Sequence, residues 1–357
     1  MSLSFSINIY LDKECRIIKC NLCRRRHMDR ELIASIEKMY RCRVIRLRPK
    51  RTVWLCDTNR GNWVIKGYDN FNQAAWVTHL SHTLHQRGFR DVVRYILTIQ
   101  NVPVFKWKDY YMTAMERIPG REGSYFNKAD ILHSLTKLAE FHLHSMFIPG
   151  GPPPEEGVPL LVKWEDRYRS FLHIHGQIQN SENRQSRLAQ LIQSGAPAIL
   201  KEAEYVLGVA RRSLLTGEYT ASLYQQHIAH KDLASHNFLL SGKRSFLIDL
   251  DTAAYDTPLV DIIQLISRAL VLQGWGLSIF TEAIEAYRSV RPLSDTQVAL
   301  IFLLLRFPDN FMREVTGVFE KRKNFQASRV EQYLAIIMKN WQRRERFFAG
   351  YEHFLYA

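Results

Sequence analysis

The fold of this chain is most clearly indicated by two neighbouring stretches: residues 230–237 read HKDLASHN, and residues 245–251 read SFLIDLD. The first has the pattern H-x-D-x-x-x-x-N, and the second is an apolar run with an Ile-Asp pair near its end. The turn Ser241–Lys243 separates them and predicts a short hairpin. Each piece alone is common, because Asp-x-x-x-x-Asn is usually a turn or a helix cap. Their order, with Asp249 seventeen residues after Asp232, indicates that they act together.

These residue types suit phosphoryl transfer. That reaction needs a carboxylate near the attacking hydroxyl and oxygen ligands that hold Mg²⁺ against the phosphates. Asp232 can supply the carboxylate, whereas Asn237 on the same loop and Asp249 on the adjacent strand can supply the ligands. Proteins usually hold Mg²⁺ with one or two carboxylates, together with phosphates and water. We therefore predict Asp232 as the catalytic base and Asn237 and Asp249 as Mg²⁺ ligands.

A second group of residues, nearer the N-terminus, predicts a nucleotide site. Residues 63–66 read WVIK, and the kinase fold places a lysine at the corresponding point of a strand, where it meets nucleotide phosphates. A lysine on a strand is more often a solvated charge, but Lys66 precedes both a predicted helix and the hinge-like residues 115–118. There the backbone at Glu116 is expected to hold an adenine edge, with Met115 and Ile118 packing against it. We therefore predict that Lys66, Met115, Glu116 and Ile118 bind ATP.

The order of the predicted elements indicates two lobes. Apolar spacing predicts helices over residues 29–40 and 72–87. Strand-like segments are Val44–Leu47, Thr52–Cys56, Trp63–Lys66, Val92–Thr98, Val102–Phe105 and Tyr110–Glu116. We predict an α+β protein with an N-terminal extension over residues 1–28, a small sheet-rich nucleotide lobe over 29–118 and a large helical lobe over 119–357.

The helical lobe is expected to contain the catalytic loop. A strong amphipathic pattern predicts a helix over Lys128–Met146, and helices are expected to continue to about Thr216. The Pro- and Gly-rich stretch Pro149–Gly157 cannot be regular structure and is interpreted as a surface excursion. A strand–turn–strand island over Phe238–Leu250 interrupts the helices, which then run to the C-terminus.

Composition excludes several classes of protein. The chain has 357 residues, of which 46% are hydrophobic and 24% charged, as in ordinary globular proteins. The longest apolar run, Val298–Leu305, has eight residues, far short of the ~20 that a membrane-spanning helix needs, so no membrane partner is expected. The N-terminus lacks the pattern of a secretory signal. The five cysteines are odd in number and confined to residues 15–56, which favours a reducing compartment during synthesis.

Positive charge is concentrated near the two ends. Residues 1–51 contain 14 basic and 5 acidic side chains, and residues 321–346 contain 8 and 2. Such ends either favour an anionic partner or form a solvated basic surface, which is the commoner case. No stacking set or recognition motif accompanies Arg24–Arg26, so nucleic acid is not an expected partner.

Together these motifs resemble the aminoglycoside phosphotransferase and choline kinase group, whose two-lobed fold is similar to that of protein kinases. Three further stretches, Phe246–Asp261, Ala286–Asp295 and Arg306–Pro308, resemble the bacillar spore-coat kinase-like proteins of the CotS family. This resemblance implies a kinase-like fold, synthesis in the mother-cell cytoplasm and a place in the spore coat among other coat proteins. It also implies the roles given above for Asp232, Asn237, Asp249 and Lys66, and it does not imply a substrate.

By the same resemblance, Asp251 and Asp261 match acidic positions that are more often structural. His142, in the predicted helix Lys128–Met146, is interpreted as a packing histidine rather than a catalyst.

Two departures from the pattern leave two functions open. The helix after Lys66 should carry a Glu that pairs with the lysine, but residues 72–87 contain no acid, and Gln73 is the nearest polar stand-in. The phosphate-covering loop should be rich in glycine, whereas Arg48–Arg51 has none. The favoured function is ATP- and Mg²⁺-dependent phosphate transfer to a hydroxyl acceptor, either a small molecule or a coat component. The alternative is a catalytically weak or inactive structural protein of the coat.

Overall fold

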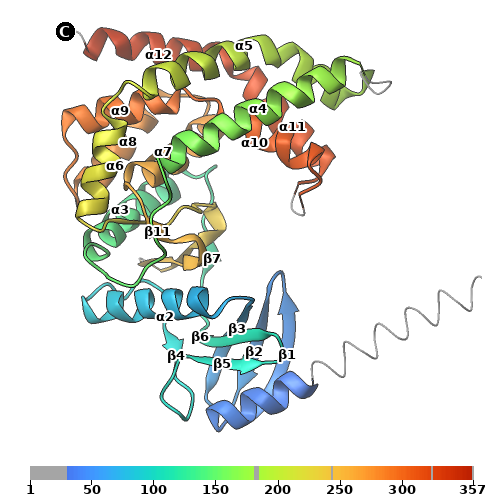
Figure 1. The fold of residues 1–357 in the computed structure, drawn as a ribbon, viewed down its shortest axis with the longest axis vertical. Coiled ribbons are helices and arrows are strands. Elements are labelled where there is room, and N and C mark those ends of the chain that lie inside the picture. The colour runs from blue at the N-terminus through green and yellow to red at the C-terminus, as the bar shows by residue number, and fades with distance from the viewer. Residues whose placement is uncertain (1–29, 181–184, 243, 323–324, 356–357) are drawn as a thin grey trace, which may run out of the picture. The chain divides into compact units, whose positions relative to one another are not determined.

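The computed structural model describes residues 30–180, 185–242, 244–322 and 325–355 (Figure 1). The fold divides into two units. The first comprises the described chain up to His85 together with Val93–Ile118, and the second comprises Gln86–Val92 and the described chain from Pro119 onward. The predicted N-terminal extension, residues 1–28, lies outside the described residues.

The first unit is built around an antiparallel sheet, as predicted. Its strands, in spatial order, are β1 (Val44–Lys50), β2 (Val53–Thr58), β3 (Gly61–Tyr68), β6 (Tyr110–Glu116) and β4 (Tyr95–Ile96), with β5 (Val104–Trp107) also paired to β6. A helix over residues 30–40 buries Leu32, Ile36 and Tyr40, which are spaced by four and therefore share one helix face. These side chains join Trp63 and Ile65 of β3 in one core. The helix α2 (Phe71–Gln86) follows β3, close to the predicted bounds.

Two predictions about the strands are wrong. The segment Val92–Thr98 forms a strand only at Tyr95–Ile96, because Val92 bridges to Leu247 in the second unit and Thr98 turns back to accept the N–H of Asn101. The predicted loop Arg48–Arg51 is mostly strand: β1 continues to Lys50, and only residues 51–52 form the turn to β2. Pro49, which has no backbone N–H to donate, is tolerated there because β1 is an edge strand of the described sheet.

The second unit is mainly helical, as predicted. Its helices are α3 (Lys128–His144), α4 (Pro159–Gln179), α5 (Arg187–Ala210), α6 (Leu215–Tyr224), α7 (Leu259–Gln273), α8 (Leu277–Arg288), α9 (Asp295–Leu305), α10 (Asp309–Phe319), α11 (Ala327–Lys339) and α12 (Trp341–Leu355). The helical run before the strand island is therefore longer than predicted and ends at Tyr224 instead of Thr216. Among the described residues, no helix has the length and apolar character that a membrane span requires.

Short strands in this unit frame the loop that carries the predicted catalytic residue. The predicted island is the hairpin β9 (Phe238–Ser241) and β10 (Arg244–Leu247), which is joined on its other edge by β7 (Arg121–Glu122). A second small sheet pairs β8 (Ile228–Ala229) with β11 (Ala254–Tyr255). The predicted excursion Pro149–Gly157 contains neither helix nor strand.

The close approach of β7 to β9 depends on a glycine and gives a test of this packing. A Cβ at Gly120 would lie 2.7 Å from the backbone oxygen of Leu240, closer than real Cβ atoms come to such an atom. Gly120→Ala should therefore lower the unfolding free energy by about 1–3 kcal/mol, as overpacking does. Thermal unfolding of the two proteins measures this effect.

The matched control for that test is Gly208→Ala in α5, where nothing lies within 4 Å of the added Cβ. This variant should keep or raise the melting temperature, because alanine favours a helix interior over glycine by about 1 kcal/mol. Equal melting temperatures for Gly120→Ala and the parent protein would contradict the described β7–β9 contact.

Candidate active site

The loop over residues 230–237 is held at its start by the carboxylate of Asp261, in the first turn of α7. This carboxylate accepts hydrogen bonds from the backbone N–H of His230 at 2.6 Å and of Lys231 at 2.8 Å. It accepts a third from Nε2 of His142, on α3, at 3.0 Å. The side chains of Asp261 and His142 are both fully buried. The beginning of the loop is thus tied to two helices through one carboxylate.

The protonation of this network follows from its surroundings. Burial raises the pKa of Asp261, but the hydrogen bond from His142, the electrostatic interaction with the imidazoles of His142 and His230 and the backbone N–H of His230 outweigh it and bring the pKa below its usual value. Burial lowers the pKa of His142, so its imidazole is neutral at pH 7. The Nε2–H then donates to Asp261, while Nδ1 accepts from the Tyr287 hydroxyl at 2.9 Å. Asp261 therefore stays ionised without a charged partner.

The residue after Asp232 is fixed by three more side chains. The N–H of Leu233 donates to Oε1 of Gln264 at 2.9 Å. The carbonyl of Leu233 accepts from the Tyr125 hydroxyl and from the Arg268 guanidinium, each at 2.6 Å. Because Lys231 and Leu233 are both anchored, the backbone position of Asp232 between them is set from either side.

The structure brings Asp232 and Asn237 together. Nδ2 of Asn237 donates to the backbone oxygen of Asp232 at 2.9 Å and to its Oδ2 at 3.4 Å. The backbone oxygen of Asn237 in turn accepts the N–H of Ile248 at 2.9 Å, so the chain enters Asp249 directly beside Asn237. The predicted base and the two predicted ligands therefore come from adjoining backbone segments of one unit.

Two residues of this region have a left-handed backbone, which side chains other than glycine rarely adopt. Lys231 has φ 66° and Asp249 has φ 66°. Such conformations persist where the surroundings over-determine them, and they concentrate at functional sites. At Lys231 the hydrogen bond from its N–H to Asp261 offsets the strain. Asp249 lies between the end of β10 and the short 3₁₀ turn Leu250–Thr252.

The donor chemistry at Asn237 and Asp249 fits Mg²⁺. Both side-chain hydrogen bonds of Asn237 leave from Nδ2, which turns its Oδ1 away from Asp232. An amide oxygen and a carboxylate are hard ligands of the kind that Mg²⁺ prefers. The described residues contain no cluster of three or more His, Cys, Asp or Glu side chains that suits a metal ion. A metal at this pair would therefore complete its coordination with phosphate oxygens and water.

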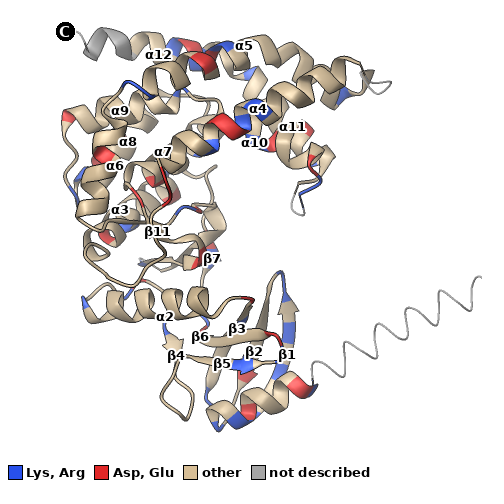
Figure 2. Cartoon of the chain, in the orientation of Figure 1, with Lys and Arg blue, Asp and Glu red and all other residues tan. Residues whose placement is uncertain are grey.

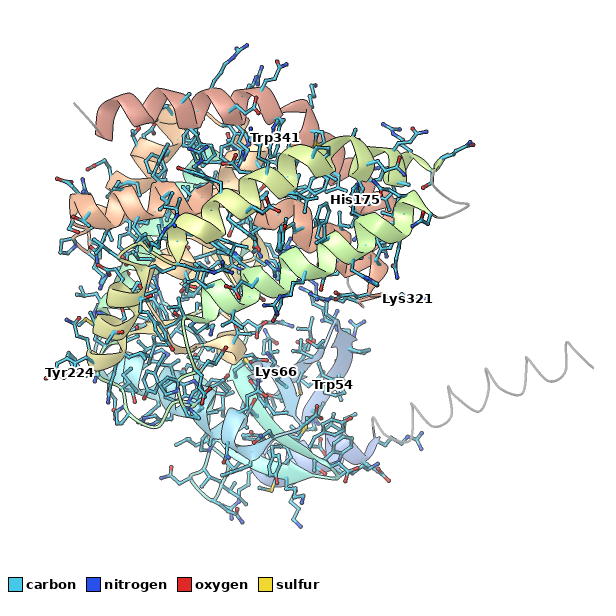
Figure 3. All side chains as sticks on the ribbon, turned by 45° about the horizontal axis from the view of Figure 1, so that its top comes forward. Trp54, Lys66, His175, Tyr224, Lys321 and Trp341 are labelled. Carbon is cyan, nitrogen blue, oxygen red and sulfur yellow. The ribbon has the colours of Figure 1, made fainter. Side chains whose placement is uncertain are left out.

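The predicted nucleotide-binding residues lie in the first unit. Lys66, labelled in Figure 3, pairs with Thr113 across β3 and β6, and Val64 pairs with Met115 two residues further along the same strands. Since alternate and directly paired residues point to one face, Lys66 and Met115 share a sheet face. Glu116 closes β6, and its N–H donates to the carbonyl of Arg94 at 2.9 Å. Ile118 is the last residue of the unit and is half-buried.

The helix that follows Lys66 lacks the acidic residue expected to pair with the lysine, as the sequence indicates. α2 contains no Asp or Glu, so it offers the lysine no carboxylate. Nζ of Lys66 lies 5.5 Å from the ring centre of Tyr68, within reach of a cation–π contact. The turn between β1 and β2 is likewise without glycine and carries Arg51 at φ 54°.

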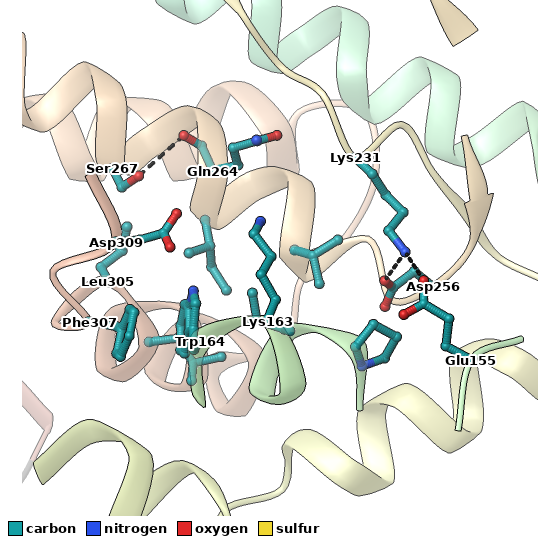
Figure 4. A pocket seen from close by; sticks show the side chains of 15 residues that line it. Glu155, Lys163, Trp164, Lys231, Asp256, Gln264, Ser267, Leu305, Phe307 and Asp309 are labelled. Carbon is teal, nitrogen blue, oxygen red and sulfur yellow. Dashed lines mark hydrogen bonds and ion pairs between the residues drawn. The ribbon is translucent and has the colours of Figure 1, made fainter. Parts of the chain in front are cut away.

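A pocket opens beside the loop within the second unit (Figure 4). It encloses about 170 Å³ and is lined by residues from α4, α7, α9 and the loops near them. Trp164 and Phe307 stack in its wall with ring centres 4.2 Å apart. Gln264, which holds Leu233, lines it, and so does Lys231. The neighbours of Asp232 on both sides are thus part of the pocket or bonded to it.

The sequence model of the Phosphotransferase enzyme family matches residues 48–293 of the chain. The chain belongs to this family. The matched segment includes β3 with Lys66, the loop with Asp232 and Asn237, and the helix that carries Asp261.

Solved structures of phosphotransferases share the fold. An aminoglycoside phosphotransferase from Alicyclobacillus acidocaldarius superimposes with a TM-score of 0.76 at 15% identity, covering 87% of this chain and 92% of the other. Spectinomycin phosphotransferase APH(9)-Ia, solved with ADP and spectinomycin, has a TM-score of 0.62 at 15% identity and covers 88% and 98%. Choline kinase LicA from Streptococcus pneumoniae has a TM-score of 0.51 at 15% identity, with coverage of 91% and 100%. These likenesses confirm the predicted α+β fold with two kinase-like lobes.

Sequence reasoning missed most of the side chains that hold the loop over residues 230–237. Tyr125, Gln264 and Arg268 are 31 to 108 residues from Leu233 along the chain, so no local pattern relates them to it. The Trp164–Phe307 stack of the pocket is missed for the same reason. Of the residues that hold this loop, the sequence pointed only to Asp261, which the family resemblance marks as structural.

The buried carboxyl of Asp256, at the end of the pocket near Lys231, predicts a pH effect on stability. Burial raises its pKa to about 6, against the opposing effect of Lys231. Between about pH 4 and pH 6 the folded protein therefore binds more protons at this site than the unfolded chain, and this contribution to stability falls as pH rises. Over this whole pH range the loss of unfolding free energy from Asp256 amounts to about 3 kcal/mol.

Asp256→Asn isolates this contribution. We expect the variant to gain stability relative to the parent protein as pH rises from 4.5 to 7.5, as measured by urea unfolding across that range. A difference in unfolding free energy that is independent of pH, or that falls with rising pH, would show that Asp256 is not desolvated as described.

Proposed function

We propose that this phosphotransferase moves a phosphate from ATP to a hydroxyl acceptor with the help of Mg²⁺. The observation that carries the proposal is the hydrogen-bonded pair Asp232–Asn237 on a loop anchored at Lys231 and Leu233, with Asp249 entering beside it. Lys66, Met115, Glu116 and Ile118 are the proposed nucleotide-binding residues. The family membership supports the reaction class, whereas the cofactors and the roles of the named residues are part of this proposal.

In this proposal each site residue of the second unit has a defined role. Asp232 orients the acceptor hydroxyl and takes its proton, and the hydrogen bond from Nδ2 of Asn237 keeps the carboxylate in place. Asn237 Oδ1 and Asp249 hold Mg²⁺, which when bound offsets negative charge on the phosphate oxygens. Lys231 and Gln264 place the adjoining pocket beside Asp232, so we assign that pocket to the acceptor.

A second candidate function is a catalytically weak or inactive structural protein of this fold. The observation that favours it is α2, which lacks the acidic residue expected to position Lys66. The glycine-free turn after β1 points the same way, because side chains there prevent a close backbone approach to phosphates. Weak nucleotide binding and slow turnover are accordingly expected even if the protein is an enzyme.

We also propose that the protein is made in the mother-cell cytoplasm and assembles with other proteins in the spore coat. The support is the resemblance of Phe246–Asp261, Ala286–Asp295 and Arg306–Pro308 to CotS-type coat proteins. The acceptor is then a small molecule or a component of the coat.

Replacing the proposed base tests the enzyme. Asp232→Asn keeps the shape of the side chain and removes its charge, so ATP turnover should fall by about 100-fold or more, while MgATP binding changes little. Turnover measured by phosphate release and binding measured by calorimetry separate the two quantities. Asp166→Asn, which removes an exposed carboxylate from α4, is the control and should turn over like the parent protein.

Two results decide between the candidates. Unchanged turnover in Asp232→Asn would remove Asp232 from the mechanism. Absence of MgATP binding by the parent protein would leave the structural role.

The location is tested by a fluorescent fusion followed through sporulation. We expect signal in the mother cell first and in the coat fraction of mature spores later. Signal that stays in vegetative cells and never enters the coat fraction would contradict the location. Spores carrying Asp232→Asn should assemble a normal coat only if the phosphate has no part in it.

A further inference from the structure

We propose that the pocket selects an acceptor that carries an anionic group, a carboxylate or a phosphate, and binds that group at Lys163. The inference rests on the proposed function, because it treats the pocket as the acceptor site, and it adds the chemical class of the acceptor. Lys163 extends from α4 into the pocket between Asp309 and the Lys231–Asp256 pair (Figure 4).

Lys163 is a cation for which the described protein supplies no direct counter-ion. Its ammonium forms neither a hydrogen bond nor an ion pair with any described residue. The carboxylate that acts on it electrostatically, Asp309, is already paired with Arg167. Asp309 therefore acts on Lys163 only at longer range, and the ammonium keeps its hydrogen-bond donors for a ligand.

The surroundings of Lys163 carry excess positive charge. Arg167, Arg268 and Arg313 all act on it, and the carboxylates in this region are engaged elsewhere: Asp309 by Arg167 and Glu314 by Arg313. Arg268 donates to the Leu233 carbonyl and has no ion pair with a described carboxylate. Of the two lysines that line the pocket, Lys231 is paired with carboxylates, whereas Lys163 has no ion pair with a described residue.

The pKa values respond to this imbalance. Desolvation and the three arginines lower the pKa of Lys163, although the residue is exposed to solvent at the pocket. The arginine and lysine charges overcome burial at Asp309 and bring its pKa to about 2. An anion bound at Lys163 would favour the charged ammonium and supply the missing negative charge.

At the opposite end of the pocket the lysine is already paired with carboxylates. There Nζ of Lys231 lies 3.3 Å from Oε1 of Glu155 and 3.3 Å from Oδ2 of Asp256. This end is next to Asp232 in the chain, so an acceptor held at Lys163 has its hydroxyl end at Lys231. The two ends therefore differ in charge as the two ends of a hydroxy acid or a sugar phosphate do.

The size and wall of the pocket limit the rest of the acceptor. A volume of about 170 Å³ is close to the ~150 Å³ cavity that holds one benzene ring. The Trp164–Phe307 stack and Leu305 give one apolar side to that space. The acceptor portion that enters is accordingly one ring in size.

Four sugars of one ring size test the charge preference: glucuronate and glucose 6-phosphate are anionic, glucose is neutral and glucosamine is cationic. Binding to the full chain is followed by tryptophan fluorescence, since Trp164 lies in the wall, and by calorimetry. We expect both anionic sugars to bind at least tenfold more tightly than glucose, and glucosamine to bind most weakly. Tighter binding of glucuronate than of glucose 6-phosphate points to a carboxylate acceptor, and the reverse points to a phosphate.

Lys163→Gln should abolish the preference for the anionic sugars while leaving MgATP binding and the melting temperature close to those of the parent protein. Lys201→Gln, which removes an exposed lysine from α5, is the matched control and should keep the preference. An unchanged preference in Lys163→Gln, tightest binding of glucosamine, or no measurable binding of any of the four sugars overturns the proposal. Failure of the proposed function shows separately, as absence of MgATP binding with the charge preference intact.

Discussion

A single buried carboxylate organises the loop over residues 230–237. Asp261 has no exposed surface and accepts three hydrogen bonds, two of them from successive backbone N–H groups at His230 and Lys231. A buried carboxylate left without donors would be strongly unfavourable, so the loop is held wherever those N–H groups can reach it. Lys231 is held in a left-handed conformation there, and Asp232 follows at a defined place. The neutral imidazole of His142 fixes the carboxylate from the other side.

The fold was predictable because its signals are local. The spacing within residues 230–251 and the alternation in β3 and β6 each lie within one segment, and they led to the correct α+β, two-lobed arrangement. Val92–Thr98 was misjudged for the opposite reason. Its strand-like composition is real, but tertiary pairing of Val92 with Leu247 and a turn at Asn101 leave only two residues in the sheet. Propensity for strands describes fit to a surface and yields to such pairing.

The residues of the site also fall into two groups, those that local sequence spacing identifies and those that only the folded structure brings together. Asp232, Asn237 and Asp249 were named from spacing, and their backbones adjoin in the second unit. Their supports were not named, because Tyr125, Gln264 and Arg268 reach Leu233 from separate helices and loops. The charge of the pocket was equally hidden. Net charge along the chain pointed to its ends. The ion pair that engages the carboxylate near Lys163 joins α4 to α10 and follows only from the folded structure. Figure 2 shows that basic and acidic residues occur along both units.

Amide hydrogen exchange tests the central role of Asp261 most directly. In the parent protein the N–H groups of His230 and Lys231 should exchange as slowly as the core of α7, because both are bonded to a buried carboxylate. In Asp261→Asn the side-chain NH₂ cannot accept from both, so exchange in residues 228–237 should become at least tenfold faster while the core of α7 stays protected. Equal protection of this loop in both proteins would contradict the account, since the loop would then be held by something other than Asp261.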